Sequence, residues 1–248
     1  MGAFNKVPPI LYINRDEDVY RRLHMERQFK EVGIKDYIRF SAFTDAPETT
    51  FLNYTGIDLS SRVVSQVSKC MLSHLLAIKS LDFKNSDYAL IFEDDAVLTT
   101  SKNWSFTLDE FIERLPEDWD IVQLYINFES YNESLPLLAY SYMPSHYSTV
   151  AYAISKKHAE RIVEAYFTEG IPDFKKVKEM PMHIGPYLAD RVLYTPQSIS
   201  VSLFSTEKFV STILDDVPQG YHDKSQSVID LWANNPASLD TLLSGLSL

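Results

Sequence analysis

The chain has 248 residues, with 34 acidic and 23 basic side chains and a formal net charge of −11 at pH 7. This negative charge repels phosphate backbones and anionic lipids, which argues against nucleic acid as a partner but not against a small anionic ligand held by local cations. Hydrophobic residues make up 45% of the chain, so the composition suits one large α/β domain or two small ones and excludes a largely disordered chain.

Cysteine content and hydropathy predict the compartment. The only cysteine is Cys70, which excludes an internal disulfide and favours a reducing environment. No stretch approaches the roughly 20 apolar residues of a membrane span, and the N-terminal residues do not resemble a signal peptide. We therefore expect a chain without a transmembrane segment, located in the cytoplasm.

Apolar runs and helical periodicity alternate along the chain. A run at 10–13 predicts a strand, and apolar residues at helical spacing then predict a helix that ends near Gly33. The predicted elements that follow are a strand at 37–43, a loop at 44–62, a helix at 67–81, a strand at 88–92, a helix at 106–115 and a strand at 121–125. This order predicts a doubly wound α/β core with a mostly parallel sheet between helices.

The remainder of the chain is less regular. Residues 140–142 and 150–154 are candidates for further strands, and residues 155–166 predict a helix with Ser155 as its N-cap. The last twenty or so residues contain Pro236 and several serines, and they predict a short helix or a loosely held tail.

Three adjacent carboxylates, Glu93, Asp94 and Asp95, follow the strand at 88–92. Alternation along an extended chain sends Glu93 and Asp95 to one side and Asp94 to the other. Two unit charges about 5 Å apart repel by about 3 kcal/mol at an effective dielectric constant of about 20. Because ligands of open α/β sheets bind at the carboxyl ends of strands, this cluster is a candidate site for Mg²⁺ or Mn²⁺, which could also hold a diphosphate. The alternative is that the three acids cap a turn or pair with Lys and Arg.

Several other residues have two interpretations. His74 lies on the apolar face of its helix, where a hydrogen-bonded core histidine is more common than a catalytic one. Ser73 beside it does not indicate a hydrolase, because adjacent helix residues point about 100° apart. Arg15, Arg21 and Arg22 follow the first strand, where arginines are either solvated or positioned to bind phosphate. The simplest interpretation of Cys70 is core packing.

In order, these segments resemble glycosyltransferase family 25, the lipopolysaccharide-biosynthesis and collagen galactosyltransferase type. The similar segments are the opening Tyr-Ile-Asn strand with the arginine pair 21–22, the Cys-Met-Leu-Ser-His run at 70–74, the Glu-Asp-Asp strand at 89–97, the Pro-Glu-Asp-Trp-Asp segment at 116–124 and the Tyr-Ala-Ile-Ser segment at 149–162. The chain departs from the family pattern at Arg15, where Leu is usual, and at Ser68-Lys69, where a Gly is expected before the cysteine.

The resemblance implies a GT-A-like, Rossmann-like domain at 1–215, followed by a C-terminal helix or tail at 216–248. It implies a metal-dependent, inverting transfer of a hexose, such as galactose or glucose, from a UDP-sugar to a hydroxyl of a glycan or protein. Mn²⁺ or Mg²⁺ would be held by Asp95 and Glu93. The implied donor-binding residues are Asn14, Arg15, Arg21, Arg22, Ser73, His74, Glu93 and Asp94.

The inverting chemistry needs a base for the acceptor hydroxyl. Asp190 is the candidate, because it resembles a late Asp of the family that follows two apolar residues, and His183 is the reserve. Two other functions stay open: a catalytically silent relative that acts as a binding module, and a metal-dependent hydrolase that uses the same carboxylates.

Overall fold

The structure is a computed structural model of the chain, and it describes residues 3–4, 8–44, 62–83, 86–128, 137–172, 189–207 and 220–246. The predicted loop at 44–62 and the candidate base His183 therefore lie almost wholly or wholly outside the described residues. No helix in the described ranges is both long enough and apolar enough to span a membrane.

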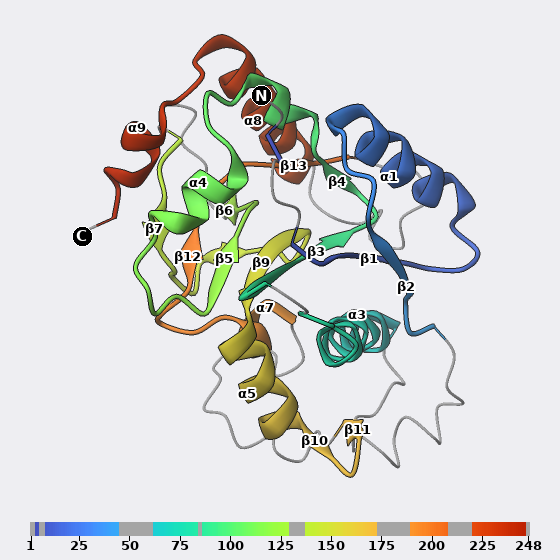
Figure 1. The fold of residues 1–248 in the computed structure, drawn as a ribbon. Coiled ribbons are helices and arrows are strands. Elements are labelled where there is room, and N and C mark those ends of the chain that lie inside the picture. Colours follow the sequence, from blue (N-terminus) through green and yellow to red (C-terminus); the bar gives the residue numbers. More distant parts are fainter. Residues whose placement is uncertain are drawn as a thin grey trace.

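A seven-stranded sheet forms the centre of the described structure (Figure 1). Its strands, in spatial order, are β2 (Ile38–Ser41), β1 (Ile10–Asn14), β3 (Tyr88–Glu93), β9 (Ala151–Ser155), β5 (Ile121–Gln123), β12 (Ile199–Ser200) and β7 (Tyr140–Ser141). The pairs β1–β2, β1–β3 and β5–β12 are parallel, whereas β9 is antiparallel to both β3 and β5, and β7 is antiparallel to β12. Apart from β9 and β7, the strands therefore share one direction, which confirms a mostly parallel α/β sheet.

Within the described residues, three short antiparallel pairs lie outside this sheet. They are β4 (Ala96–Val97) with β13 (Ser205–Thr206), β6 (Asn127–Phe128) with β8 (His146–Tyr147), and β10 (Phe167–Thr168) with β11 (Ile171–Pro172). The β4–β13 pair begins directly after Asp95, so it joins the chain that follows the carboxylates to a segment more than a hundred residues later.

Helices cover both faces of the sheet (Figure 1). On one face pack α1 (Val19–Val32), the 3₁₀ helix η1 (Thr99–Asn103), α4 (Leu108–Glu113), α8 (Gly220–Asn234) and α9 (Leu239–Leu243). On the other face pack α3 (Arg62–Lys79), α5 (Lys156–Tyr166) and α7 (Ala189–Leu193). Each face of the sheet has its own hydrophobic core, and β3 contributes side chains to both. Leu90 and Phe92 point to the first face, and Ala89 and Ile91 point to the second.

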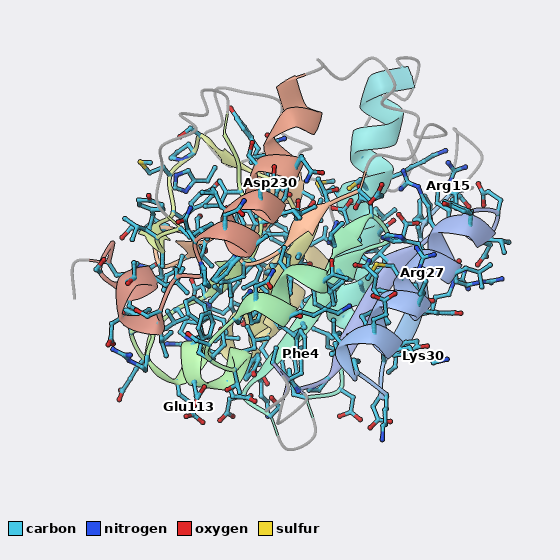
Figure 2. The ribbon with its side chains drawn as sticks, turned by 90° about the horizontal axis from the view of Figure 1, so that it is seen from above. Phe4, Arg15, Arg27, Lys30, Glu113 and Asp230 are labelled. Carbon is cyan, nitrogen blue, oxygen red and sulfur yellow. The ribbon has the colours of Figure 1, made fainter. Side chains whose placement is uncertain are left out.

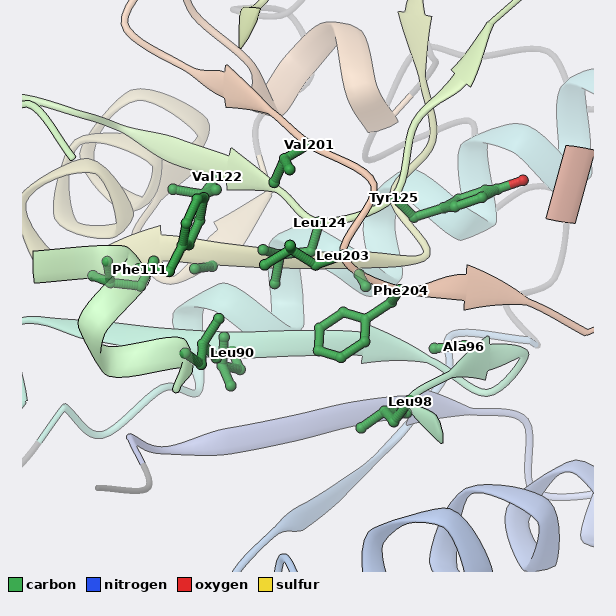
Figure 3. Close-up of a cluster of buried hydrophobic side chains, with 14 of the residues drawn as sticks. Leu90, Ala96, Leu98, Phe111, Val122, Leu124, Tyr125, Val201, Leu203 and Phe204 are labelled. Atoms are coloured by element: carbon green, nitrogen blue, oxygen red, sulfur yellow. The ribbon is translucent and has the colours of Figure 1, made fainter. Parts of the chain in front are cut away.

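The first core is rich in aromatic rings. Phe204 lies against β3 (Figure 3), with its ring edge-on to Phe92 at 5.6 Å between centroids. Trp104 stacks on Phe106 at 5.4 Å and packs near Trp232 of α8. Large rings of this kind each bury extensive apolar surface, so the C-terminal helix α8 contributes directly to the main core.

The C-terminal helices are held by hydrogen bonds as well. Trp232 Nε1 donates to the Ser202 carbonyl at 3.0 Å, and the Leu242 carbonyl accepts from the Ala139 amide at 2.7 Å. Gly245 lies against the Ala139 backbone so closely that a Cβ at this position would collide with its carbonyl. For the last twenty or so residues the sequence predicts a short helix or a loosely held tail. The structure confirms the helix, α9, and this helix packs on the core.

Local sequence signals explain the helix boundaries. Gly33 ends α1 with φ of 84°, a left-handed conformation that a residue with a side chain rarely adopts. The Ser155 hydroxyl caps α5 by accepting from the His158 amide, as predicted. Thr107 and Glu110 form a reciprocal capping box at the start of α4.

Candidate functional site

The carboxyl ends of β1 and β3 bring the first polar residues of the site together. The two strands are parallel and in register, with Ile13 opposite Glu93, so Asn14 and Asp94 leave them side by side. Asn14 Nδ2 donates to Asp94 Oδ2 at 2.8 Å, and Asn14 Oδ1 accepts from Arg39 Nε of the neighbouring strand β2 at 3.0 Å. The carboxyl ends of β1 and β3 therefore form one polar cluster, which a side chain of β2 joins, as expected for an open α/β sheet.

The first helix provides a cation for Asp94. Arg21 Nη1 donates to Asp94 Oδ1 at 2.7 Å, and both side chains are largely buried, with 14% and 8% of their surface exposed. Burial raises the pKa of Asp94, although Arg21 and Asn14 oppose this rise. Arg21 and Asn14 each donate a hydrogen bond to one oxygen of Asp94, so protein groups already compensate the negative charge of this carboxylate.

Glu93 points to the opposite face of the sheet, toward α3, as alternation predicts. Its Oε1 is 3.2 Å from His74 Nε2 and accepts from the Thr149 hydroxyl at 2.6 Å. His74 is only 1% exposed, and its Nδ1 lies 3.0 Å from the Tyr152 hydroxyl. Burial alone would raise the pKa of Glu93, but hydrogen bonding and electrostatic attraction from His74, with help from Thr149, hold that pKa below its usual value.

Asp95 differs from its two neighbours. Its backbone carbonyl accepts from the Glu207 amide at 2.7 Å, but its buried side-chain oxygen Oδ1 has no hydrogen-bond donor within the described ranges. Burial and the negative charges of Glu93 and Asp94 raise the pKa of Asp95 to about 8. A buried carboxylate oxygen without a donor, beside two other carboxylates, fits a hard divalent cation such as Mn²⁺ or Mg²⁺.

A buried glutamine on α1 holds the chain directly after the carboxylates. Gln28 Nε2 donates to the Ala96 carbonyl at 2.6 Å, and Gln28 Oε1 accepts from the Leu98 amide at 2.8 Å. Helix α1 thus fixes both Asp94, through Arg21, and the backbone that follows Asp95.

Cys70 is exposed, so the expectation that it packs in the core is wrong. It lies one helical turn before His74 on α3, on the side of the helix that meets the carboxylates. Local desolvation, together with the charges of Glu93, Asp190 and Asp95, raises the pKa of the Cys70 thiol.

Asp190, the candidate base, lies in α7 and is 7% exposed. Helix α7 packs against α3, and the Asp190 carboxylate is close enough to influence the pKa values of both Cys70 and Tyr194. The structure therefore places Asp190 on the same side of the sheet as Glu93 and His74.

Among the predicted donor-binding residues, Arg15 and Ser73 have other partners, and Arg22 is partly exposed. Arg15 pairs with Glu17 and lies 3.8 Å from Asp18. Figure 2 places Arg15 at the outer edge of the molecule, beside the helix that carries Arg27 and Lys30. Arg22 is partly exposed, and the Ser73 hydroxyl donates to the Lys69 carbonyl at 2.7 Å and accepts from the Phe43 amide at 2.9 Å. A role for these three in donor binding stays a prediction.

Asp120, in contrast, lies directly before β5, at the amino ends of the parallel strands, whereas the three carboxylates lie at the carboxyl end of β3. Its carboxylate pairs with Arg161 of α5 and accepts from the Thr195 hydroxyl at 2.7 Å. These contacts join α5 and the 195–198 turn to the sheet, so Asp120 has a structural role.

Residue patterns did not identify four contributors to the site: Arg39, Gln28, Thr149 and Tyr152. Thr149 and Tyr152 reach Glu93 and His74 because β9 enters the sheet antiparallel to β3, which places the start of β9 beside the end of β3. The backbone just before it is strained, since Ser148 has φ of 120°. The sequence signal for Thr149 and Tyr152 is their position in the segment at 149–162, which resembles a segment of the family.

The fold and the site together define a mixed α/β protein whose carboxylates, imidazole and arginine gather at the carboxyl edge of a central sheet. The family model for glycosyltransferase family 25 (LPS biosynthesis protein) matches residues 7–173, which is more than half of the chain, and the chain belongs to this family. The matched range includes Asn14, Arg21, His74 and the three carboxylates but ends before Asp190. A comparison with curated proteins found no significant match.

Proposed function

We propose that this glycosyltransferase moves a hexose from a UDP-sugar to a hydroxyl of a glycan or protein acceptor, with inversion, and that it depends on Mn²⁺ or Mg²⁺. The observation that carries the proposal is Asp95, whose buried Oδ1 has no donor in the described part of the chain and whose pKa is raised to about 8. A buried carboxylate in this state is suited to a divalent cation.

The neighbouring contacts favour Asp95 and Glu93 as the residues that hold the ion. Asp94 is the less suitable ligand, because Arg21 and Asn14 already engage its two oxygens. A bound Mn²⁺ or Mg²⁺ would supply a Lewis acid that neutralises the leaving diphosphate. Arg21 and Asn14 keep Asp94 fixed, and through the chain they keep the turn that carries Asp95 in place.

Asp190 is the proposed base for the acceptor hydroxyl. It lies near Cys70 and Tyr194, on the face of the sheet toward which Glu93 points. A carboxylate in this position would accept the proton of the acceptor hydroxyl as the new glycosidic bond forms.

Ligand-dependent thermal stability tests the donor and the metal together. The melting temperature is measured with UDP, UDP-hexoses and GDP-hexoses, each with Mn²⁺ or with EDTA. A ligand at about 100 times its Kd adds about 2.7 kcal/mol to the stability, or several degrees for a chain of this size. We expect a shift with UDP-sugars that requires Mn²⁺.

Two variants make the test specific. Asp95→Asn should lose the Mn²⁺-dependent shift, whereas Asp118→Asn, which changes an exposed aspartate before β5, should keep it. A cooperative melt that no sugar nucleotide shifts would favour a silent binding module. Release of free hexose without acceptor, as fast as any transfer, would favour a hydrolase.

A further inference from the structure

A second set of potential metal-ligand atoms lies beside the three carboxylates, and it includes sulfur and nitrogen as well as oxygen. Cys70 and His74 are four residues apart on α3, so their side chains project from the same face of the helix. Glu93 reaches them from the end of β3. The Cys70 sulfur, a ring nitrogen of His74 and a carboxylate oxygen of Glu93 all lie within 4.8 Å of one another.

We propose that Cys70, His74 and Glu93 bind one thiophilic divalent cation of the Zn²⁺ class, through Sγ, Nε2 and a carboxylate oxygen. Sulfur, imidazole and carboxylate together form a donor set that suits Zn²⁺ and its substitute Co²⁺, whereas Mg²⁺ and Mn²⁺ favour oxygen ligands. Three protein ligands leave a fourth position open to water or a substrate atom.

The spacing of the donor atoms is close to that of a tetrahedral zinc site. Bond lengths of about 2.0 to 2.3 Å around Zn²⁺ put neighbouring ligand atoms about 3.3 to 3.7 Å apart. His74 Nε2 and Glu93 Oε1 are already 3.2 Å apart. Only the Cys70 side chain has to approach, and it is exposed at the end of a single rotatable bond, so the adjustment is small.

The surrounding hydrogen bonds hold the ligands in place. Tyr152 lies 3.0 Å from His74 Nδ1, so with a metal on Nε2 the imidazole can donate its Nδ1 proton to the tyrosine oxygen. Without a metal, the opposite tautomer satisfies both nitrogens, because Nε2 donates to Glu93 and the tyrosine hydroxyl donates to Nδ1. Thr149 fixes Glu93 at 2.6 Å in either case. Binding converts the Cys70 thiol to a thiolate, and the proton goes to solvent.

This site goes beyond the proposed transferase reaction and does not depend on it. The two sites share Glu93, so an ion bound by Cys70 and His74 withdraws that carboxylate from the proposed Mn²⁺ site. Zn²⁺ should therefore oppose Mn²⁺-dependent nucleotide binding, and removal of the thiol should weaken this opposition.

Co²⁺ spectroscopy tests the site directly. Reduced, metal-free protein is titrated with Co²⁺, and thiolate-to-Co²⁺ charge-transfer absorption is recorded in the near ultraviolet. Since Cys70 is the only cysteine of the chain, any such band reports this residue. We expect a band at one equivalent of Co²⁺ that Zn²⁺ removes, and we expect Zn²⁺ to slow alkylation of Cys70 at least tenfold.

Two variants separate this site from the proposed Mn²⁺ site. Cys70→Ser, a change at an exposed position, should fold normally, lose the band and keep any Mn²⁺-dependent stabilisation. Asp95→Asn should keep the band and lose that stabilisation. A cooperatively folded, reduced protein that gives no band and no protection from alkylation would overturn the zinc-site proposal, and it would leave the transferase proposal unaffected.

Discussion

Arg21 of α1 and Asp94 at the end of β3 form a buried ion pair across 73 residues of sequence, with 2.7 Å between Nη1 and Oδ1. This pair neutralises one of the three adjacent carboxylates and ties the first helix to the edge of the sheet. Asn14 bonds to Asp94 and accepts from Arg39, so the hydrogen-bond network extends over residues of three adjacent strands or their ends. Among the three adjacent carboxylates, Asp94 is therefore the one that Arg21 pairs with directly.

Arg21→Ala should destabilise the protein by about 3 kcal/mol, because it leaves the buried Asp94 carboxylate without its cation. The free energy of unfolding from urea titration measures this loss. Arg114 offers a matched control, since its pair with Asp240 is exposed, and Arg114→Ala should cost at most about 1 kcal/mol. Equal losses for the two variants would show that Arg21 and Asp94 are not coupled as the structure indicates.

The stability contributed by Asp95 should fall as pH rises. Its pKa is about 8 in the folded chain against an ordinary value of 3.8, so the folded state holds a proton that the unfolded state releases. The contribution is fully present below about pH 4 and is lost progressively up to about pH 8. Asp95→Asn has no proton to lose, so in EDTA the variant should gain in melting temperature relative to the parent across this range. A difference that does not change with pH would contradict the raised pKa.

Mn²⁺ affinity should rise with pH up to about 8, because the ion must displace the proton of Asp95. Below this pKa, each unit of pH should change the association constant by up to about tenfold. Isothermal titration calorimetry in two buffers of different ionisation enthalpy at pH 6.5 should show release of about one proton per bound ion. Affinity that is equal at pH 6 and pH 8 would exclude Asp95 as the titrating ligand.

Gln28→Leu should cost about 1 to 3 kcal/mol, since it leaves the Ala96 carbonyl and the Leu98 amide buried without partners. It should also loosen the chain after Asp95 and weaken Mn²⁺ binding, although Gln28 lies on α1 and is not a ligand. Gln226→Leu on α8 changes the same residue type where its hydrogen bond to Asp230 is exposed, and it should leave both quantities nearly unchanged. Urea titration and Mn²⁺ calorimetry measure the two effects.

Much of the fold follows from local patterns. Helical spacing located α1, α3 and α5, and a continuous apolar run located β3 with its carboxylate end. Alternation along β3 also predicted that Glu93 and Asp94 point to opposite faces, and the contacts with His74 and Arg21 confirm this. These features depend on neighbours within a few residues, which is the range that a sequence pattern describes.

The position and direction of β9 in the sheet do not follow from such local patterns. A short apolar run indicates a strand but contains no information on its direction or its neighbours, and β9 lies antiparallel between β3 and β5. This arrangement brings Thr149 and Tyr152 to Glu93 and His74. The exposure of Cys70 also depends on the tertiary structure. Its position on an apolar helix face predicts burial, but the part of this face that carries Cys70 lies beside Glu93 at the carboxyl end of β3.

The sequence by itself determined the α/β class, the family, and the three carboxylates at the end of a buried strand, because periodicity and short motifs are local properties of the chain. Only the tertiary structure decided how those carboxylates differ. Arg21 and Asn14 compensate Asp94, His74 and Thr149 stabilise the charge of Glu93, and Asp95 keeps a buried oxygen without a donor in the described ranges. The charge state of a carboxylate depends on groups within a few ångströms, and these groups come from segments that are up to 80 residues apart.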